Sequence, residues 1–180
     1  MSKEKDVVAF LIEPIQGEAG VYVPREGYLT ESKILCQENN VLFIADEIQT
    51  GIGRTGRLIA CDHEDVKPDV LLLGKALSGG LYPVSAVLAN NTIMEVIKPG
   101  QHGSTFGGNP LGAKTAMAAL DVVKEENLAA QASQMGEIFR IRMQKVVENS
   151  QWVNQVRGRG LLNALVVNDS EESSTAWEIC

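Results

Sequence analysis

The sequence has 180 residues, 44% of them hydrophobic and 22% charged, which is enough to bury the core of one domain, or of one domain with part of a second. Its net charge of −7 and the lack of a basic patch argue against a nucleic-acid partner, and no apolar run approaches the roughly 20 residues that span a bilayer. Three widely spaced cysteines, Cys36, Cys61 and Cys180, predict a reducing compartment without a disulfide framework.

The first 110 residues alternate between short apolar runs and polar segments. A helix is predicted over Tyr28–Asn40 from its apolar spacing of three and four. A loop is predicted over 98–110, where glycine and polar residues dominate. Four apolar runs of strand length predict buried strands, namely Val7–Ile12, Val41–Ala45, Asp69–Leu73 and Val84–Ala89.

After Pro110 the sequence becomes helical. The Ala-rich stretch Leu111–Glu126 and the segment from Leu128 to Glu148 both have helical periodicity. Arg157–Gly160 predicts a turn that leads into an apolar strand, Leu161–Val167. Residues 168–175 predict a loop, and the final AWEIC predicts the first turn of a helix.

The order of strands and helices predicts an α/β fold with a mostly parallel sheet covered by helices on both faces. In such sheets the functional groups gather beyond the carboxyl ends of the strands. Asp46 and Lys75 each follow a predicted strand directly or within two residues, so both are expected at that edge.

Two motifs indicate other functions only weakly, a dinucleotide-binding turn and a metal site. Residues 51–56, GIGRTG, have the glycine spacing of a dinucleotide-binding turn, but DEIQT separates them from the strand and a poor helix former follows. Asp46 and Glu47 would also repel a pyrophosphate at this point, so the glycines are better explained as turns. Cys61-x-His63 has no second pair that would complete a metal site, and no metal is predicted.

A buried Asp46 needs a cationic or hydrogen-bonding partner, and a poorly solvated Lys75 has the same need. A lysine after a strand is commonly a solvated residue, but the two together suggest a cofactor between them. A lysine in a partly buried site can form a Schiff base, and an aspartate can keep a pyridine nitrogen protonated, which makes the ring an electron sink. This combination suggests pyridoxal chemistry.

Four motifs in order, EPIQGEAG (13–20), LFIADEIQTGIGRTG (42–56), LLGKALSGGLYPVSAV (72–87) and HGSTFGGNPLG (102–112), resemble the class III pyridoxal-phosphate-dependent aminotransferases of fold type I. The resemblance covers nearly the whole chain. It implies that 1–126 form part of the cofactor-binding large domain and 127–180 the start of a small C-terminal α+β domain. It also implies pyridoxal 5'-phosphate as cofactor.

The resemblance also implies roles for individual residues. Lys75 would form the Schiff base with the cofactor and move the proton, Asp46 would pair with the pyridine nitrogen, and Gln49 would reach the phenolic oxygen of the ring. Thr105, with Ser104 in the same loop, would bind the phosphate of the neighbouring subunit's cofactor, so that a homodimer or higher homo-oligomer completes the site.

Glu18 in GEAG resembles the glutamate that helps set substrate preference by pairing with an arginine near the family's C-terminus. Arg54, in the glycine turn, and His102, which has no visible acidic partner, are assigned no role. The resemblance implies that the substrates are an amino acid and a 2-oxo acid, with no nucleic-acid or membrane partner.

The residues of the motifs GKALSGGLYPVSAV and HGSTFGGNPLG most resemble the branch of the family that moves the δ-amino group of ornithine to 2-oxoglutarate, giving glutamate 5-semialdehyde and glutamate. The branches acting on 4-aminobutyrate or N-acetylornithine remain alternatives, as does a non-catalytic interaction chain. Family members are usually more than twice as long, so this chain is expected to be a fragment or a truncated product, inactive or nearly so alone. The compartment implied is the mitochondrial matrix, with the cytoplasm as the alternative.

Overall fold

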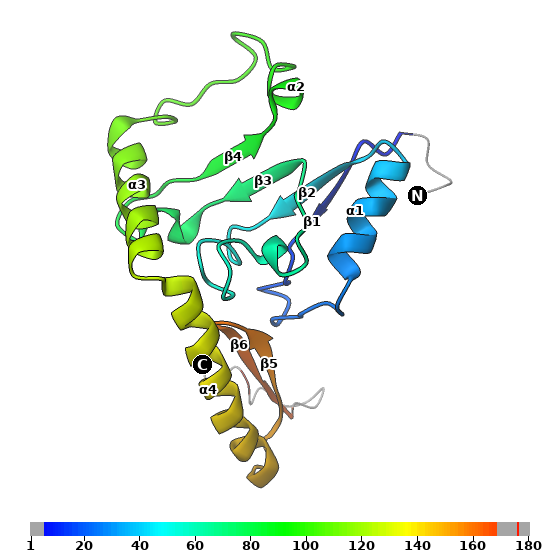
Figure 1. The fold of residues 1–180 in the computed structure, drawn as a ribbon, viewed down its shortest axis with the longest axis vertical. Coiled ribbons are helices and arrows are strands. Elements are labelled where there is room, and N and C mark those ends of the chain that lie inside the picture. Colours follow the sequence, from blue (N-terminus) through cyan, green and yellow to red (C-terminus); the bar gives the residue numbers. More distant parts are fainter. Residues whose placement is uncertain (1–5, 169–175, 177–180) are drawn as a thin grey trace.

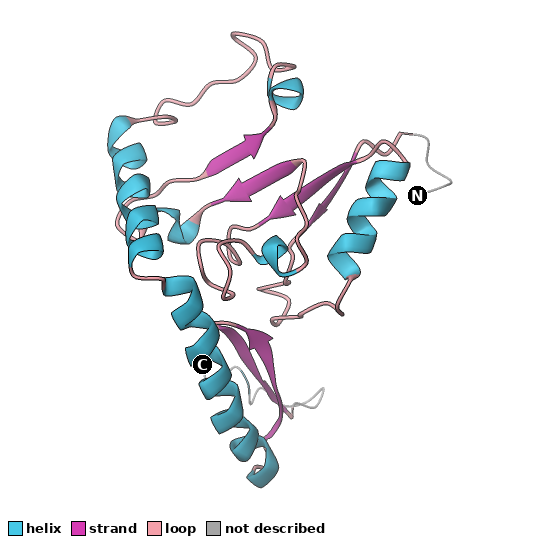
Figure 2. Ribbon diagram, in the orientation of Figure 1, coloured by secondary structure: helices cyan, strands magenta, loops and turns pink. Residues whose placement is uncertain are grey.

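A computed structural model describes residues 6–168 and residue 176, and its ribbon divides into a central sheet and a separate hairpin (Figure 1). The sheet has the order β1-β2-β3-β4, and the hairpin pairs β5 with β6. Helices lie on either side of the sheet, and the longest one runs from the sheet to the hairpin (Figure 2). The strands are β1 (Ala9–Ile12), β2 (Leu42–Asp46), β3 (Val70–Leu73), β4 (Ala86–Ala89), β5 (Val153–Arg159) and β6 (Leu162–Val167). The helices are α1 (Tyr28–Glu38), α2 (Asn91–Met94), α3 (Pro110–Glu125), α4 (Leu128–Asn149) and the short 3-10 helices η1 (Ala60–His63) and η2 (Lys75–Ser78).

The first three strands of the sheet are parallel, and β4 joins β3 antiparallel. The prediction of an α/β fold with a mostly parallel sheet is therefore confirmed, and all four predicted strands of the first 110 residues are present. The register places Asp46 opposite Leu72, so the carboxyl ends of β2 and β3 lie side by side.

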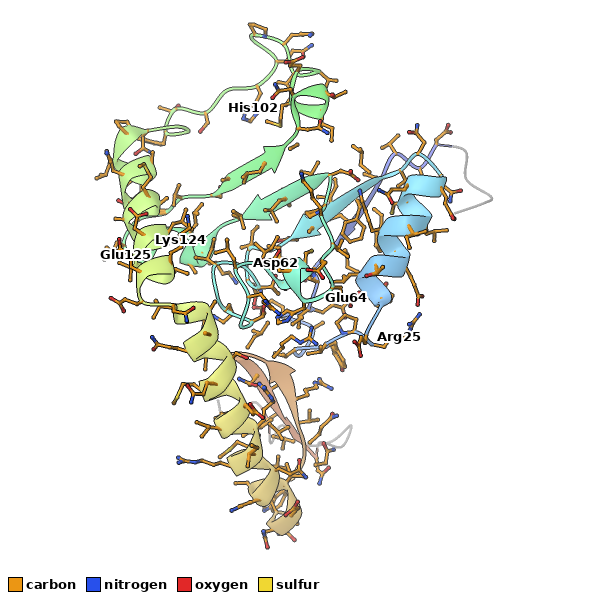
Figure 3. All side chains as sticks on the ribbon, viewed as in Figure 1. Arg25, Asp62, Glu64, His102, Lys124 and Glu125 are labelled. Carbon is orange, nitrogen blue, oxygen red and sulfur yellow. The ribbon has the colours of Figure 1, made fainter. Side chains whose placement is uncertain are left out.

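Helix α1 covers one face of the sheet. Phe43 and Ala45 of β2 point into a core that also contains Leu29 and Cys36 of the helix, all of them at most 3% exposed. The alternation of buried and half-buried residues along β2 is that of a strand with one fully packed face. Glu64 lies beside the beginning of α1 (Figure 3), where its carboxylate accepts a hydrogen bond from the Thr30 backbone N–H at 3.0 Å.

The opposite face is less completely covered. Leu11 of β1 is 59% exposed and Val87 of β4 is 58% exposed. The register places Val87 across β3 from Asp46, so this more open face is the one that carries Asp46. Helix α3 packs at the β3–η2 end, so helices flank the sheet as predicted, although Leu11 and Val87 stay exposed.

Helices α3 and α4 follow each other with a break at Asn127, whose φ of 52° ends the regular helix. Helix α3 begins with Pro110 in its first turn, and the Asn109 side chain accepts a hydrogen bond from the Gly112 N–H at 2.7 Å. Both predicted helices are confirmed to within one residue at each end. Within the described residues no helix is long and apolar enough to cross a membrane.

The hairpin differs from its prediction. Arg157–Arg159 belong to β5 and the turn lies at Gly160 and Leu161, so the predicted turn over Arg157–Gly160 is wrong. Arg140 of α4 fixes this turn, because its guanidinium donates to the Gly160 carbonyl at 3.0 Å and to Asn163 Oδ1 at 2.9 Å. Apart from Asn168 and Ala176, the predicted C-terminal loop and helical turn lie outside the described residues.

Candidate active site

The carboxyl ends of β2 and β3 bring Asp46 and Lys75 to one edge of the sheet. Asp46 is the last residue of β2 and pairs with Leu72. The next backbone N–H, that of Glu47, donates to the Leu72 carbonyl at 3.0 Å. Lys75 follows Leu72 by three residues, so the two strand ends hold both residues at the same edge, as predicted from the sequence.

Lys75 is the first residue of η2 and has a left-handed backbone with φ of 41°. A side chain in this conformation is strained, and such strain is concentrated at functional sites. The Lys75 side chain is exposed in this chain, so the expectation that it is poorly solvated is wrong. Lys75, Ala76 and Ser78 of η2 line a wide cavity.

This cavity has a volume of about 1120 Å³, above the range of about 300 to 1000 Å³ that is typical of ligand sites. Lys75 and Gln49 both line it, so the structure brings these two predicted residues together. Its wall opposite the strand ends is formed by α3. The polar lining residues are Gln49, Arg54, Lys75, Ser78, Lys114 and Thr115, and the apolar ones include Ile48, Ile52, Val122 and Val123.

Asp46 lies beside this cavity and not in its lining. Its side chain is half-buried, and Oδ1 accepts a hydrogen bond from the Ile48 N–H at 3.1 Å. Of the two kinds of partner expected for Asp46, the structure provides the hydrogen-bonding one, since the ion pairs formed by the described residues are Arg25–Glu31 and Lys33–Asp69. Asp46 is therefore held by its own turn.

Gln49 and Glu18 are in direct contact. Gln49 Nε2 donates to Glu18 Oε1 at 3.2 Å. The Gln49 amide also packs over Gly17, where even a Cβ atom would come within 2.4 Å of Gln49 Oε1. The strand-end turn after β2 and the loop after β1 thus meet at these two side chains.

The loop with Ser104 and Thr105 lies apart from the cavity. Both residues are exposed, and Ser104 Oγ accepts a hydrogen bond from the Gly107 N–H at 2.9 Å within the loop. Figure 3 shows His102 on the same loop, beyond β4. The structure does not bring Ser104 or Thr105 to the lysine.

The sequence model of the family described as aminotransferase class-III matches residues 1–180. The chain belongs to the class-III aminotransferases. Among similar proteins, the mitochondrial ornithine aminotransferase of Rattus norvegicus is 58% identical over 178 residues, which are 99% of this chain and 40% of that protein. That of Drosophila ananassae is 57% identical over 178 residues, with the same coverage of 99% and 40%.

Solved structures of two aminotransferases superimpose closely. The acetylornithine aminotransferase of Elizabethkingia anophelis has a TM-score of 0.95 and 66% identity, over 99% of this chain and 45% of that one. The ornithine aminotransferase of Toxoplasma gondii has a TM-score of 0.90 and 53% identity, over 92% of this chain and 40% of that one. The chain therefore spans less than half the length of the relatives that it matches.

The cavity fits the cofactor of class-III aminotransferases in its chemistry. Lys75 offers a primary amine to an aldehyde, Gln49 offers an amide to a ring oxygen, and the apolar wall suits a flat ring. Asp46 has a second carboxylate oxygen that accepts no hydrogen bond from the described residues. These groups are chemically compatible with pyridoxal phosphate, with Lys75 and Gln49 in the cavity lining and Asp46 outside it.

The glycines of GIGRTG are turns, as the sequence analysis favoured. Gly53 and Gly56 have φ of 86° and 97°, and a Cβ atom on Gly56 would come within 3.0 Å of Ser133 in α4. Only the short η1 follows. His63 Nε2 lies 3.1 Å from the Thr55 carbonyl oxygen, and the described residues contain no cluster of metal-ligating side chains.

Sequence reasoning missed three residues near the site. Arg54 and Lys114 line the cavity, and neither has a local signal that separates it from a surface cation. Glu47 is fully buried although Asp46 was expected to be the buried acid. The sequence carries no signal for Glu47, since residues 41–45 are continuously apolar, and the alternation that Glu47 continues appears only in the burial of Val41, Phe43 and Ala45.

Proposed function

We propose that the complete protein containing this chain is a pyridoxal 5'-phosphate-dependent aminotransferase that moves the δ-amino group of ornithine to 2-oxoglutarate. Its products would be glutamate 5-semialdehyde and glutamate. The observation that carries the proposal is the presence of Lys75 and Gln49 in one cavity of a chain that matches the class-III family over its whole length. Ornithine is the amino donor that the names of the rat and fly relatives support.

The cofactor, when bound, withdraws electrons from the substrate carbon that loses its proton. Lys75 would hold the cofactor covalently through Nζ and then carry the proton to and from that carbon. Asp46 would keep its carboxylate against the ring nitrogen, and Gln49 would orient the ring through its amide. Glu18, held by Gln49, would contribute to the choice of substrate.

The remaining assignments extend the same proposal. Thr105 and Ser104 would bind the cofactor phosphate of a second subunit, which agrees with their position away from Lys75. Residues 1–126 would be part of the large domain and 127–180 the start of the small one, with the boundary at the break before α4. A mitochondrial matrix location would agree with the names of the rat and fly relatives.

N-acetylornithine is a second candidate substrate. The structure named as an acetylornithine aminotransferase is 66% identical to this chain, a higher value than those of the rat and fly ornithine aminotransferases. A panel of ornithine, N-acetylornithine and 4-aminobutyrate, measured as kcat/KM on the complete protein, separates the candidates. We expect ornithine to give the highest value, and a higher value for N-acetylornithine would overturn the donor assignment.

The cofactor proposal is tested on the 180-residue chain. It is mixed with pyridoxal phosphate, reduced with borohydride and mapped by mass spectrometry. Lys114 lines the same cavity and is also exposed, so it provides a matched control. We expect labelling concentrated at Lys75, lost in Lys75→Arg and kept in Lys114→Arg.

Equal labelling of Lys75, Lys114 and surface lysines would contradict a cofactor site in this chain. The same preparation, assayed with ornithine and 2-oxoglutarate, should show no or almost no turnover, because a chain that spans 40% of its relatives is expected to lack parts of the site. A measurable ornithine-dependent turnover would show that the chain is sufficient.

A further inference from the structure

The loop that carries Glu18 has a strained backbone. Between Gln16 and Tyr22, which pair in a short antiparallel bridge, Gly20 has φ of 117° and Val21 has φ of 56°. A positive φ in a β-branched residue is rare and persists only where the surroundings fix it. Val21 is also buried, at 8% exposure, so the turn needs an external hold to keep this geometry.

Arg157 of β5 provides that hold from 137 residues away in the sequence. Its Nε and NH2 atoms both donate to the Gly20 carbonyl oxygen, at 2.9 and 2.7 Å. The guanidinium also lies 3.9 Å above the centre of the Tyr22 ring. A planar, charged group with several donors can do both at once, and a lysine cannot.

The turn also positions the side chain that meets Gln49. The N–H groups of Gly20 and Val21 donate to the Gly17 carbonyl at 2.9 and 3.0 Å, so Glu18 sits inside the turn that Arg157 holds. Gly17 packs against the Gln49 amide, and Glu18 accepts its hydrogen bond. A shift of Gly20 would therefore move Glu18 relative to Gln49.

We propose that Arg157 is a positioning residue, which fixes Glu18 against Gln49 by clamping the Gly20 carbonyl and the Tyr22 ring. The hairpin β5–β6 thereby sets the geometry of the substrate-facing loop. This inference rests on the proposed function for its catalytic meaning, because Glu18 and Gln49 belong to that site. The contact itself is measured without cofactor or substrate.

The experiment uses the 180-residue chain with isotope-labelled glutamine and follows the Gln49 side-chain amide by NMR. Glu18→Ala defines the signal of a Gln49 that lacks its acceptor. Arg157→Ala should move the signal toward that reference, and Arg157→Lys should restore only part of the difference. Arg142→Ala is the matched control, since Arg142 is exposed on α4 and makes no hydrogen bond or ion pair with other described residues.

Hydrogen exchange supplies a second readout. In Arg157→Ala the Gly20 and Val21 amides should exchange about tenfold faster, as expected when two charge-assisted hydrogen bonds are lost. Labelling of Lys75 by pyridoxal phosphate should stay as in the unchanged chain. The proposal for Arg157 and the proposal for the cofactor site are thereby tested separately, because each can be contradicted while the other holds.

An unchanged Gln49 signal in Arg157→Ala would overturn the proposal, even with faster exchange, because Arg157 would then only stabilise the turn. If Arg157→Ala does not fold, the Gln49 signal is compared in Arg157→Lys and Tyr22→Leu instead. Each removes one part of the clamp, the forked donors or the aromatic face. A Gln49 signal that stays in place in both would equally overturn it.

Discussion

The buried carboxylate of Glu47 accepts a hydrogen bond from the backbone N–H of Cys61 at 2.8 Å, and both residues are fully buried. The same carboxylate accepts from the Ala60 N–H at 2.9 Å and from the Thr50 hydroxyl. These bonds tie the strand end that carries Asp46 to the beginning of η1. Both carboxylate oxygens therefore have hydrogen-bond partners, as a buried acid requires. Burial, together with the Glu47 carboxylate, raises the pKa of the Cys61 thiol, which favours its neutral form.

Replacing Glu47 should therefore destabilise the chain strongly. Glu47→Ala leaves the Ala60 and Cys61 N–H groups unpaired, and each such group costs about 1 to 3 kcal/mol, so we expect a loss of about 2 to 6 kcal/mol. Urea unfolding measures it. Glu137→Gln, on the exposed side of α4, should change stability by no more than about 0.5 kcal/mol. Equal stabilities of the two variants would show that the Glu47 network contributes nothing.

The strands that position the site were predicted well from local sequence patterns. The apolar runs before Asp46 and Lys75 are long enough to identify β2 and β3, and the strand ends follow from them. Strand β5 was missed because VNQVRGR contains only two apolar residues, and the pairing register shifts between Val153 and Gln155. That shift breaks the period of two by which strands are recognised.

Burial at the site was predicted less well, because it depends on contacts between distant segments. Asp46 and Glu47 are adjacent and chemically alike, and only the packed face of β2 decides which one is buried. The contact between Arg157 and Gly20 joins residues 137 positions apart. No local pattern in either segment indicates it.

The ion pair between Lys33 of α1 and Asp69 should give acid-sensitive stability. Lys33 Nζ lies 2.7 Å from Asp69 Oδ2, which also accepts from the Phe43 N–H at 2.8 Å. Burial alone would raise the pKa of Asp69, but the Lys33 ammonium and the Phe43 amide outweigh it and lower the pKa. The stabilisation is then fully present above the unfolded pKa of about 3.9 and is lost as the pH falls through the lower folded value.

Asp69→Asn tests this pair by urea unfolding at a series of pH values. We expect a loss of about 1 kcal/mol at pH 7, which shrinks below about pH 4. Lys33→Met should weaken the same dependence, leaving the part due to the Phe43 amide, and the double variant should cost less than the sum of the two. A loss that is independent of pH in both variants would exclude the ion pair as its source.

His63 should make a separate contribution at milder pH. Burial lowers the pKa of its imidazole, and the Arg159 and Arg57 cations act in the same direction against the opposing Thr55 carbonyl and Asp62. A histidine with a lowered folded pKa favours folding fully above the unfolded pKa of about 6.5, and its contribution is lost as the pH falls toward the folded value.

The measurement is the urea stability of the unchanged chain and of His63→Gln between pH 8 and about pH 5, a range chosen around the ordinary histidine pKa. Stability of the unchanged chain should decrease with acid in this range, and His63→Gln should flatten the decrease. His102→Gln is the control, because His102 is exposed on its loop. Equal slopes in all three chains would remove His63 as the cause.

The backbone conformation of Lys75 should destabilise the folded chain. Its φ of 41° is unfavourable for any residue with a Cβ atom, and its side chain is exposed and makes no hydrogen bond or ion pair with other described residues. Lys75→Gly should therefore be more stable than Lys75→Ala, by up to about 1 kcal/mol in thermal or urea unfolding. Lys75→Val should be the least stable of the three, because a β-branched side chain fits this conformation worst.

Lys67→Gly is the control at another exposed lysine. Lys67 is not among the residues with positive φ, so glycine should lower the stability there. A destabilising effect of glycine at both positions would show that the backbone at Lys75 is not strained. A gain at Lys75 alone would identify the lysine as one kept for its amine at the expense of stability.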